Sequence, residues 1–218
     1  LYKLKKAIFL SALFVLSVFY AAKAQDPKQI FTSKEVVWFG LDFTKAKFVG
    51  SFDQGNGINP ASGSDMKNKY IPGWNALILK EPQHFRIKES FRKDDVFYDI
   101  ESVGKLNNEI DPDDCMVIND QQIERNAIDE MVKKYTSSKK EGLGLVFIVE
   151  SFNKNALMAN VYVTFFDIAS KQVLLTEKLR GVPVGIGMRN YWAGAIKQIL
   201  KDVDLYEYKK WKDRTMQK

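Results

Sequence analysis

The chain has 218 residues, of which 28% are charged and 45% hydrophobic, and its formal net charge at pH 7 is +6. These proportions are typical of a folded globular protein and exclude collagen-like, low-complexity and wholly disordered chains. The single cysteine excludes a disulfide framework, and the single histidine excludes a metal site built from two histidines.

Residues 1–24 have the three-part pattern of a secretory signal peptide. Three lysines form a basic start, residues 7–22 are an uncharged and mostly apolar run, and Ala22-Lys23-Ala24 gives the small-x-small pattern that signal peptidase recognises. We therefore expect cleavage before Gln25 and export of the mature chain to the periplasm or the medium, with no transmembrane segment left. The alternative is an uncleaved anchor, since the apolar run approaches the length of a spanning helix.

The charge balance changes if this segment is removed. Residues 1–24 contain four lysines and no acid, so the mature chain keeps 29 basic residues against 27 acidic ones, a net charge of +2. Nucleic-acid binding needs a strongly basic surface, so we expect no nucleic-acid partner. Residues 25–218 are enough to bury a full core, and we expect them to form a single domain.

The first part of the mature chain alternates between short apolar runs and helical patterns. Aromatic and β-branched residues, turn-forming residues and helical spacing identify these elements in turn. In chain order the sequence predicts a buried strand over 35–43, a glycine-rich loop over 51–64, helices over 66–78 and 85–93, a strand over 96–103, an acidic loop over 107–114 and a brief strand over 115–118.

A longer helix is predicted to begin at Asn119. Gln122 lies three residues on and gives a capping-box arrangement. Apolar side chains then recur on one face as far as Tyr135, which is the pattern of a helix that packs against a core.

The C-terminal third has the clearest pattern. The apolar run 143–149 is typical of a strand in the middle of a sheet, and two short polar turns join it to strands over 159–168 and 173–179. Three strands joined by short turns predict an antiparallel meander. A glycine-rich loop over 181–187 then leads to an amphipathic helix over 188–203.

This order of elements predicts an α+β fold. We expect a mixed, mostly antiparallel sheet that ends in the three-strand meander, with the amphipathic helices packed on one face.

The segment Tyr162 to Gly181, with the turn and helix after it, resembles the end of several exported bacterial envelope domains. The shared features are an Asp at the end of one strand, a polar turn, and a strand that ends in Gly. The resemblance is to the α/β domain of the curli-secretion lipoprotein family and to the N-terminal domain of TolB-type proteins. The whole chain also resembles uncharacterised secreted proteins of Bacteroidetes-type bacteria. These resemblances imply an envelope location and no particular chemistry, and the lipoprotein cysteine is missing.

The glycine-rich loop before the last helix is a candidate anion site. The free N–H groups and the positive dipole end of the helix could hold an anion between Gly185, Gly187 and Arg189. The glycine spacing fits neither a Walker loop nor a dinucleotide fingerprint. A tight strand-to-helix turn would explain the glycines without any ligand.

The C-terminal tail, residues 205–218, is a candidate partner-binding segment. It mixes basic and aromatic residues, which suits an acidic partner or anionic lipid head groups. The residues concerned are Tyr206, Tyr208, Lys209, Lys210 and Trp211. The alternative is that the helix runs on and packs Tyr208 and Trp211 on the sheet.

Catalytic groups are scarce. We interpret His84 as an exposed or capping residue, Cys115 as a buried inert thiol, and the acidic loop around Asp111 as a solvated turn. We therefore expect no catalytic residue, no metal and no cofactor.

Two classes of function follow. We favour a non-catalytic binding or assembly module of the cell envelope, whose partner is an unknown envelope protein or an anionic surface. The alternative is a small exported hydrolase that uses carboxylates, drawn from Asp99, Glu101 and Glu150. A pocket with two facing acids of raised pKa would favour the hydrolase, whereas an exposed apolar patch would favour the binding module.

Overall fold

The computed structural model of this protein describes residues 26–52 and 59–217. The predicted signal peptide, residues 1–24, lies outside the described residues, so its cleavage stays a prediction.

The centre of the molecule is a seven-stranded sheet. Its longest strand, β5, pairs on one side with β1 and then with β2, and on the other side with β6, which pairs with β7. β3 pairs with β1, and β4 pairs with β2. The strands are β1 (Glu35–Asp42), β2 (Lys47–Val49), β3 (Asp95–Tyr98), β4 (Met116–Val117), β5 (Leu143–Asn153), β6 (Met158–Asp167) and β7 (Val173–Gly181).

Most of these pairings are parallel, so the molecule is an α/β fold and the expected α+β fold with a mostly antiparallel sheet is wrong. β1 runs parallel to both β3 and β5, and β2 runs parallel to both β4 and β5. Parallel neighbours need crossover connections, and here these connections hold the helices. The antiparallel pairings are confined to β5, β6 and β7, where the short turns of the meander lie.

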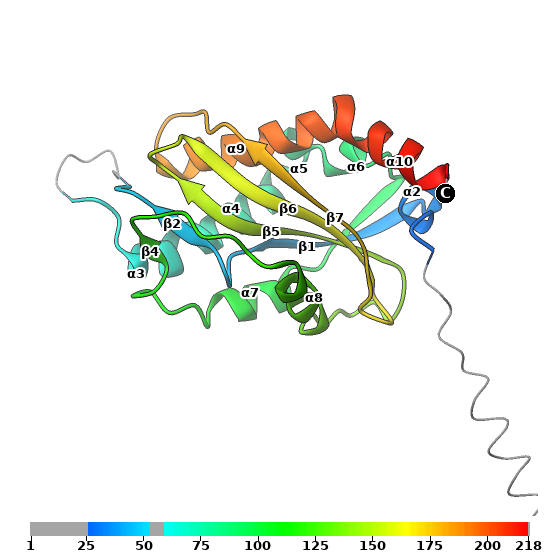
Figure 1. Ribbon diagram of the computed structural model, residues 1–218, viewed down its shortest axis with the longest axis horizontal. Helices are drawn as coiled ribbons and strands as arrows, with labels where there is room; N and C mark the ends of the chain where they lie inside the picture. The colour runs from blue at the N-terminus through cyan, green and yellow to red at the C-terminus, as the bar shows by residue number, and fades with distance from the viewer. Residues whose placement is uncertain (1–25, 53–58, 218) are drawn as a thin grey trace, which may run out of the picture.

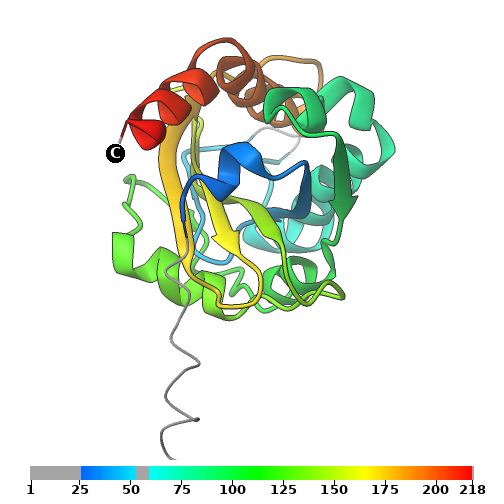
Figure 2. The same ribbon diagram turned by 90° about the vertical axis from the view of Figure 1, so that its right-hand side faces the viewer.

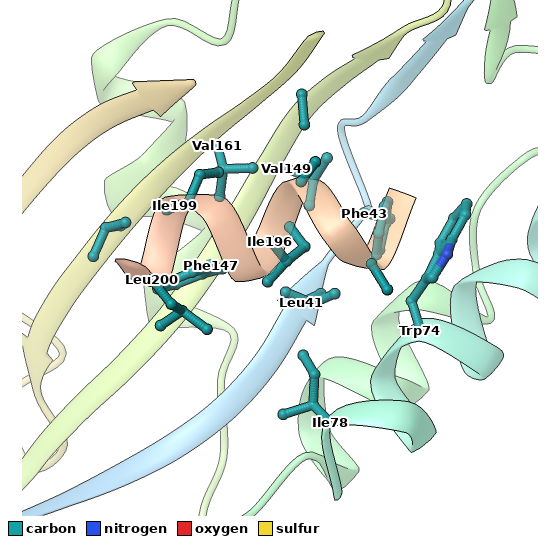
Figure 3. Packing of buried hydrophobic residues seen from close by; sticks show 14 of the residues in the cluster. Leu41, Phe43, Trp74, Ile78, Phe147, Val149, Val161, Ile196, Ile199 and Leu200 are labelled. Carbon is teal, nitrogen blue, oxygen red and sulfur yellow. The ribbon is translucent and has the colours of Figure 1, made fainter. Parts of the chain in front are cut away.

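Helices cover both faces of the sheet, not one face as expected. On one face, α4 (Ile71–Lys80) and α9 (Met188–Asp202) pack on β1, β5 and β6 around Trp74, Ile196 and Phe147 (Figure 3). On the other face, α7 (Glu101–Asn107) and α8 (Arg125–Lys133) enclose a smaller core around Phe39 and Val132. Figures 1 and 2 show α9 and α10 on one side of the strands and α7 and α8 on the opposite side.

Most of the helices are short, and α9 is the longest of those described. The helices are α2 (Gln29–Thr32), α3 (Gly63–Asp65), α4 (Ile71–Lys80), α5 (Pro82–Phe85), α6 (Ile87–Ser90), α7 (Glu101–Asn107), α8 (Arg125–Lys133), α9 (Met188–Asp202) and α10 (Tyr208–Met216), with π-helical turns η1 (Met66–Tyr70) and η2 (Val203–Glu207). α9, η2 and α10 follow one another without a break, so the C-terminal third of the chain ends in one long helical path (Figure 1).

Two expected elements differ because side chains distant in sequence bind the backbone. The strand predicted over 96–103 ends at Tyr98, where the Asp99 carboxylate accepts hydrogen bonds from Ser137 Oγ at 2.8 Å and Ser138 N at 3.0 Å, and the chain turns into α7. The helix predicted from Asn119 begins only at Arg125, because Ile123 N donates to Glu150 Oε2 at 3.0 Å and holds the preceding segment extended along the sheet.

Candidate functional site

The loop between β7 and α9, residues 182–187, is held tightly on the helix that follows it. A Cβ atom on Gly194 would lie 1.9 Å from the carbonyl oxygen of Val184, and one on Gly181 would lie 2.2 Å from the carbonyl oxygen of Ala195. Only glycine permits such approaches. In addition, Val184 N donates a hydrogen bond to Tyr191 O at 3.1 Å. The loop backbone is therefore fixed to α9 at several points.

This fixed loop carries three aliphatic side chains that water reaches. Val182 is 54% exposed, Val184 67% and Ile186 92%, whereas Pro183 between the first two is buried. We call Val182, Val184 and Ile186 the apolar row. Isolated exposed aliphatic residues are ordinary on a protein surface, but three at alternate positions of one fixed loop indicate an interaction site.

Two cavities flank the loop and share Gly185. The smaller cavity, about 210 Å³, lies between Lys154 of the β5–β6 turn and the start of α9, beside Tyr191 and Trp192. The larger one, about 540 Å³, is a groove along α9, and its lining includes Val184 and Ile186 of the apolar row together with Glu81. Its cationic residues are Arg189, Lys197 and Lys201.

The predicted anion-binding residues do not come together in one cavity. Gly185 and Gly187 line the smaller cavity, whereas Arg189 lines the groove and its Nε donates to Asn190 Oδ1 at 3.2 Å. The cation at the smaller cavity is Lys154, whose Nζ lies 4.8 Å from the centre of the Tyr191 ring. The anion site at Gly185, Gly187 and Arg189 therefore stays a prediction.

Sequence reasoning named Arg189 but missed Lys197 and Lys201 of the groove, although a signal was present. Arg189, Lys197 and Lys201 are separated by multiples of four residues, which places them on one face of α9. Lys154 gave no such signal, because its place beside α9 depends on how the β5–β6 turn packs.

The predicted partner-binding residues of the tail divide between surface and core. Tyr208 and Trp211 are buried, so they pack on the sheet as in our alternative interpretation and cannot contact a partner in this fold. Tyr206 is exposed, Lys209 pairs with Asp213, and Lys210 Nζ lies 3.3 Å from a carboxylate oxygen of Glu207. The tail therefore presents cations and one tyrosine, without the mixed aromatic surface that we expected.

The candidate hydrolase acids are separated, and each has partners of its own. Glu150 is buried in β5, where it pairs with Lys178 and accepts a hydrogen bond from Tyr162 Oη at 3.0 Å. Glu101 pairs with Lys105 on the exposed side of α7. Asp99 is bound by the two serines that follow α8, so each of the three acids is engaged in a separate contact.

A buried acid that the sequence did not single out lies at the carboxyl end of β1. Asp42 accepts hydrogen bonds from Tyr135 Oη and from Thr44 Oγ1 and N, at 2.7 Å and 2.8 Å for the two Thr44 atoms. Burial raises the pKa of the Asp42 carboxyl. A cavity of about 210 Å³ adjoins it, lined also by Lys45 and Lys134. These bonds fix the turn from β1 to β2, which is a sufficient structural role for Asp42.

His84, Cys115 and the acidic loop around Asp111 have the surroundings of structural residues. His84 is exposed, with Nδ1 3.1 Å from Glu81 Oε2, and Cys115 is buried, with burial raising the pKa of its thiol. Asp114 of the acidic loop pairs with Lys47 at 2.8 Å. Within residues 26–52 and 59–217, no three acidic, histidine or cysteine side chains gather as a metal site would require.

Comparison with protein-family models, with curated proteins and with solved structures found no match to this chain. The resemblance to envelope domains therefore stays a prediction. In the part of the chain that the structure describes, no helix has the length and apolar character to cross a membrane.

Proposed function

We propose that this protein is a non-catalytic binding module of the cell envelope, and that it binds through the apolar row and the groove beside it. The observation that carries the proposal is the apolar row itself. Its three aliphatic side chains stand in water on a backbone that glycine contacts and a hydrogen bond hold to α9.

The energetics favour a binding role for this row. An exposed aliphatic side chain adds little to folding, but it contributes about 1.5–3 kcal/mol when a partner buries it fully. A rigid loop also loses little conformational entropy on binding, because it is already ordered. The proposed envelope location rests on the signal-peptide pattern of residues 1–24.

The hydrolase alternative has less support. Its three candidate acids are each engaged in separate structural contacts. Asp42, the buried acid beside a cavity, accepts hydrogen bonds from Thr44 in its own turn and from Tyr135, which follows α8. A general acid or base must reach a substrate proton directly or through one water molecule.

The proposal is tested by cell fractionation. Cells that express the full chain are separated into envelope pellet and supernatant, and the share of the protein in each is measured for the wild type and for Val184→Ser/Ile186→Ser. We expect the double variant to lose at least about tenfold in envelope association, because two buried aliphatic contacts disappear.

The matched control is Leu205→Ser/Tyr206→Ser. These two side chains are exposed to a similar degree, 53% and 65%, but they lie on η2. We expect this variant to fractionate like the wild type. Equal association of all three proteins with the envelope would overturn the proposed contact surface, and retention in the cytosol would overturn the envelope location.

A further inference from the structure

The apolar row belongs to a larger apolar end of the molecule. In the antiparallel ladder Ala159 pairs with Gly181, so the β5–β6 turn before Ala159 and the loop after Gly181 leave the sheet side by side. Leu157, in that turn, is 47% exposed. Figure 1 shows both connections at one end of the sheet, with α2 and the C-terminus at the other end.

The shape of this end of the molecule favours a lipid bilayer over a protein as the partner. Ile186 is 92% exposed, and the loop that carries the row lies between two hollows, so this end of the molecule is uneven and not a flat patch. A protein partner would need a complementary hole for each projecting side chain. A bilayer interface accepts projecting aliphatic side chains without such complementarity, because lipids rearrange around them.

The charge around the row favours an anionic partner. Lys154 lines the cavity on one side of the loop, and Arg189, Lys197 and Lys201 line the groove on the other side; we call these four residues the flanking cations. Among the described residues that line either hollow, Glu81 is the single acid, and it lies 3.9 Å from Lys197. Apolar side chains surrounded by cations are the pattern of a surface that binds anionic membranes.

We infer that the apolar end binds the surface of an anionic lipid bilayer, with the apolar row among the lipid head groups and the flanking cations against their phosphates. This inference rests on the proposed function, since it names the partner of the same surface. The protein binds at the membrane surface without crossing it. The apolar end faces the membrane, and the C-terminus faces away from it.

The test is co-sedimentation with lipid vesicles. Residues 25–218 contain every described element and are mixed with vesicles of phosphatidylcholine alone or of phosphatidylcholine with phosphatidylglycerol. We expect binding to the anionic vesicles that exceeds binding to the neutral ones at least about tenfold and that weakens as salt is added. Ile186→Ser and Arg189→Glu/Lys197→Glu should each lower it about tenfold.

Two control variants make the result specific to this surface. Leu205→Ser removes an exposed aliphatic side chain elsewhere, and Lys209→Glu/Lys212→Glu reverses two exposed cations of α10. Both should bind vesicles like the wild type. If the α10 variant loses binding and the Arg189→Glu/Lys197→Glu variant does not, the tail binds the lipid and the inference is wrong. Circular dichroism confirms that each variant is folded.

The remaining outcomes separate the inference from the proposed function. Absence of vesicle binding, together with envelope association that still depends on the row, means a protein partner: the inference fails and the proposed function stands. Absence of both overturns both. Light scattering without vesicles tests for a second copy, and a dimer that Ile186→Ser converts to a monomer would also overturn the inference.

Discussion

Glu150 is the residue whose role is most hidden in the sequence. Its carboxylate takes Lys178 as its ion-pair partner and accepts hydrogen bonds from Tyr162 Oη and Ile123 N, both at 3.0 Å. These partners come from three different segments, so no local spacing announces the cluster. Glu150, which we considered as a catalytic acid, instead holds the segment before α8 against the sheet.

Removing only the cation of this cluster should lower the free energy of unfolding more than removing both charges of the ion pair. Lys178→Met leaves a buried carboxylate without its cation, so we expect a loss of about 3 kcal/mol in the free energy of unfolding, measured with urea. Adding Glu150→Gln removes the uncompensated charge and keeps an acceptor for Tyr162 and Ile123, and it should recover at least half of that loss. A double variant less stable than Lys178→Met would refute this account.

The buried Lys93 side chain should give the free energy of unfolding an unusual dependence on pH. Its buried Nζ donates to Ile30 O at 2.6 Å and Ser33 O at 2.7 Å, and burial lowers its pKa to about 8, against 10.5 in the unfolded chain. Between these values the unfolded state binds more protons, so this group makes stability rise with pH from about 8 to 10.5. The rise is limited to about 1.4 kcal/mol per pH unit.

The tyrosines oppose this effect only at higher pH. The pKa of Tyr162 is raised to about 12, chiefly by burial and then by its bond to Glu150, so its stabilisation is lost as pH rises above 10. The Cys115 thiol, whose pKa burial raises above its ordinary value of 9.0, opposes the Lys93 effect above that pH. Urea unfolding at intervals from pH 7.5 to 9.0 should therefore show rising stability in the wild type and a flatter profile in Lys93→Met. Lys212→Met, on the exposed side of α10, serves as the control and should keep the rise.

At the scale of helices and strands, the sequence pattern predicted those elements that depend on neighbouring residues alone. The meander of β5, β6 and β7 and the start of α9 at Met188 follow from short turns and regular spacing. The late start of α8 does not, because a single hydrogen bond from Ile123 to a distant acid decides it. The glycine loop before α9 was visible as a turn, but the exposure of its aliphatic side chains depends on contacts with α9.

Gly194 tests whether the loop depends on those contacts. Gly194→Ala would place a Cβ against the backbone of Val184, so the loop must shift, and we expect a loss of about 1–3 kcal/mol in urea unfolding. Gly104→Ala in α7 meets nothing within 4 Å and should instead be neutral or stabilise by up to about 1 kcal/mol. Similar effects of the two substitutions would show that the loop is not fixed by α9.

At the scale of the whole molecule, the sequence indicated the strands but not their partners. β1 and β2 lie end to end along β5, about a hundred residues further along the chain, in parallel register. Nothing in an apolar run such as 35–43 distinguishes a parallel from an antiparallel neighbour, and short connections suggested the antiparallel choice. The sequence left two interpretations of the basic tail open for the same reason, since the burial of Tyr208 and Trp211 depends on a surface made by distant segments.

The C-terminal tail brings the two ends of the described chain together. Trp211 is fully buried, the Tyr208 ring meets Phe31 of α2 edge-on at 5.3 Å between ring centres, and Arg214 pairs with Glu177 of β7. Deleting residues 209–218 therefore removes core contacts. Loss of a buried large aromatic alone costs about 3–5 kcal/mol, so the melting temperature should fall by about 10 °C or more.

Calorimetry of the deletion and of Trp211→Ala measures this fall, and Lys209→Ala/Lys210→Ala, which changes only exposed positions, should melt near the wild-type temperature. A deletion variant that melts like the wild type but leaves the envelope fraction would show that the tail is a binding surface after all, because a core element cannot be removed without loss of stability.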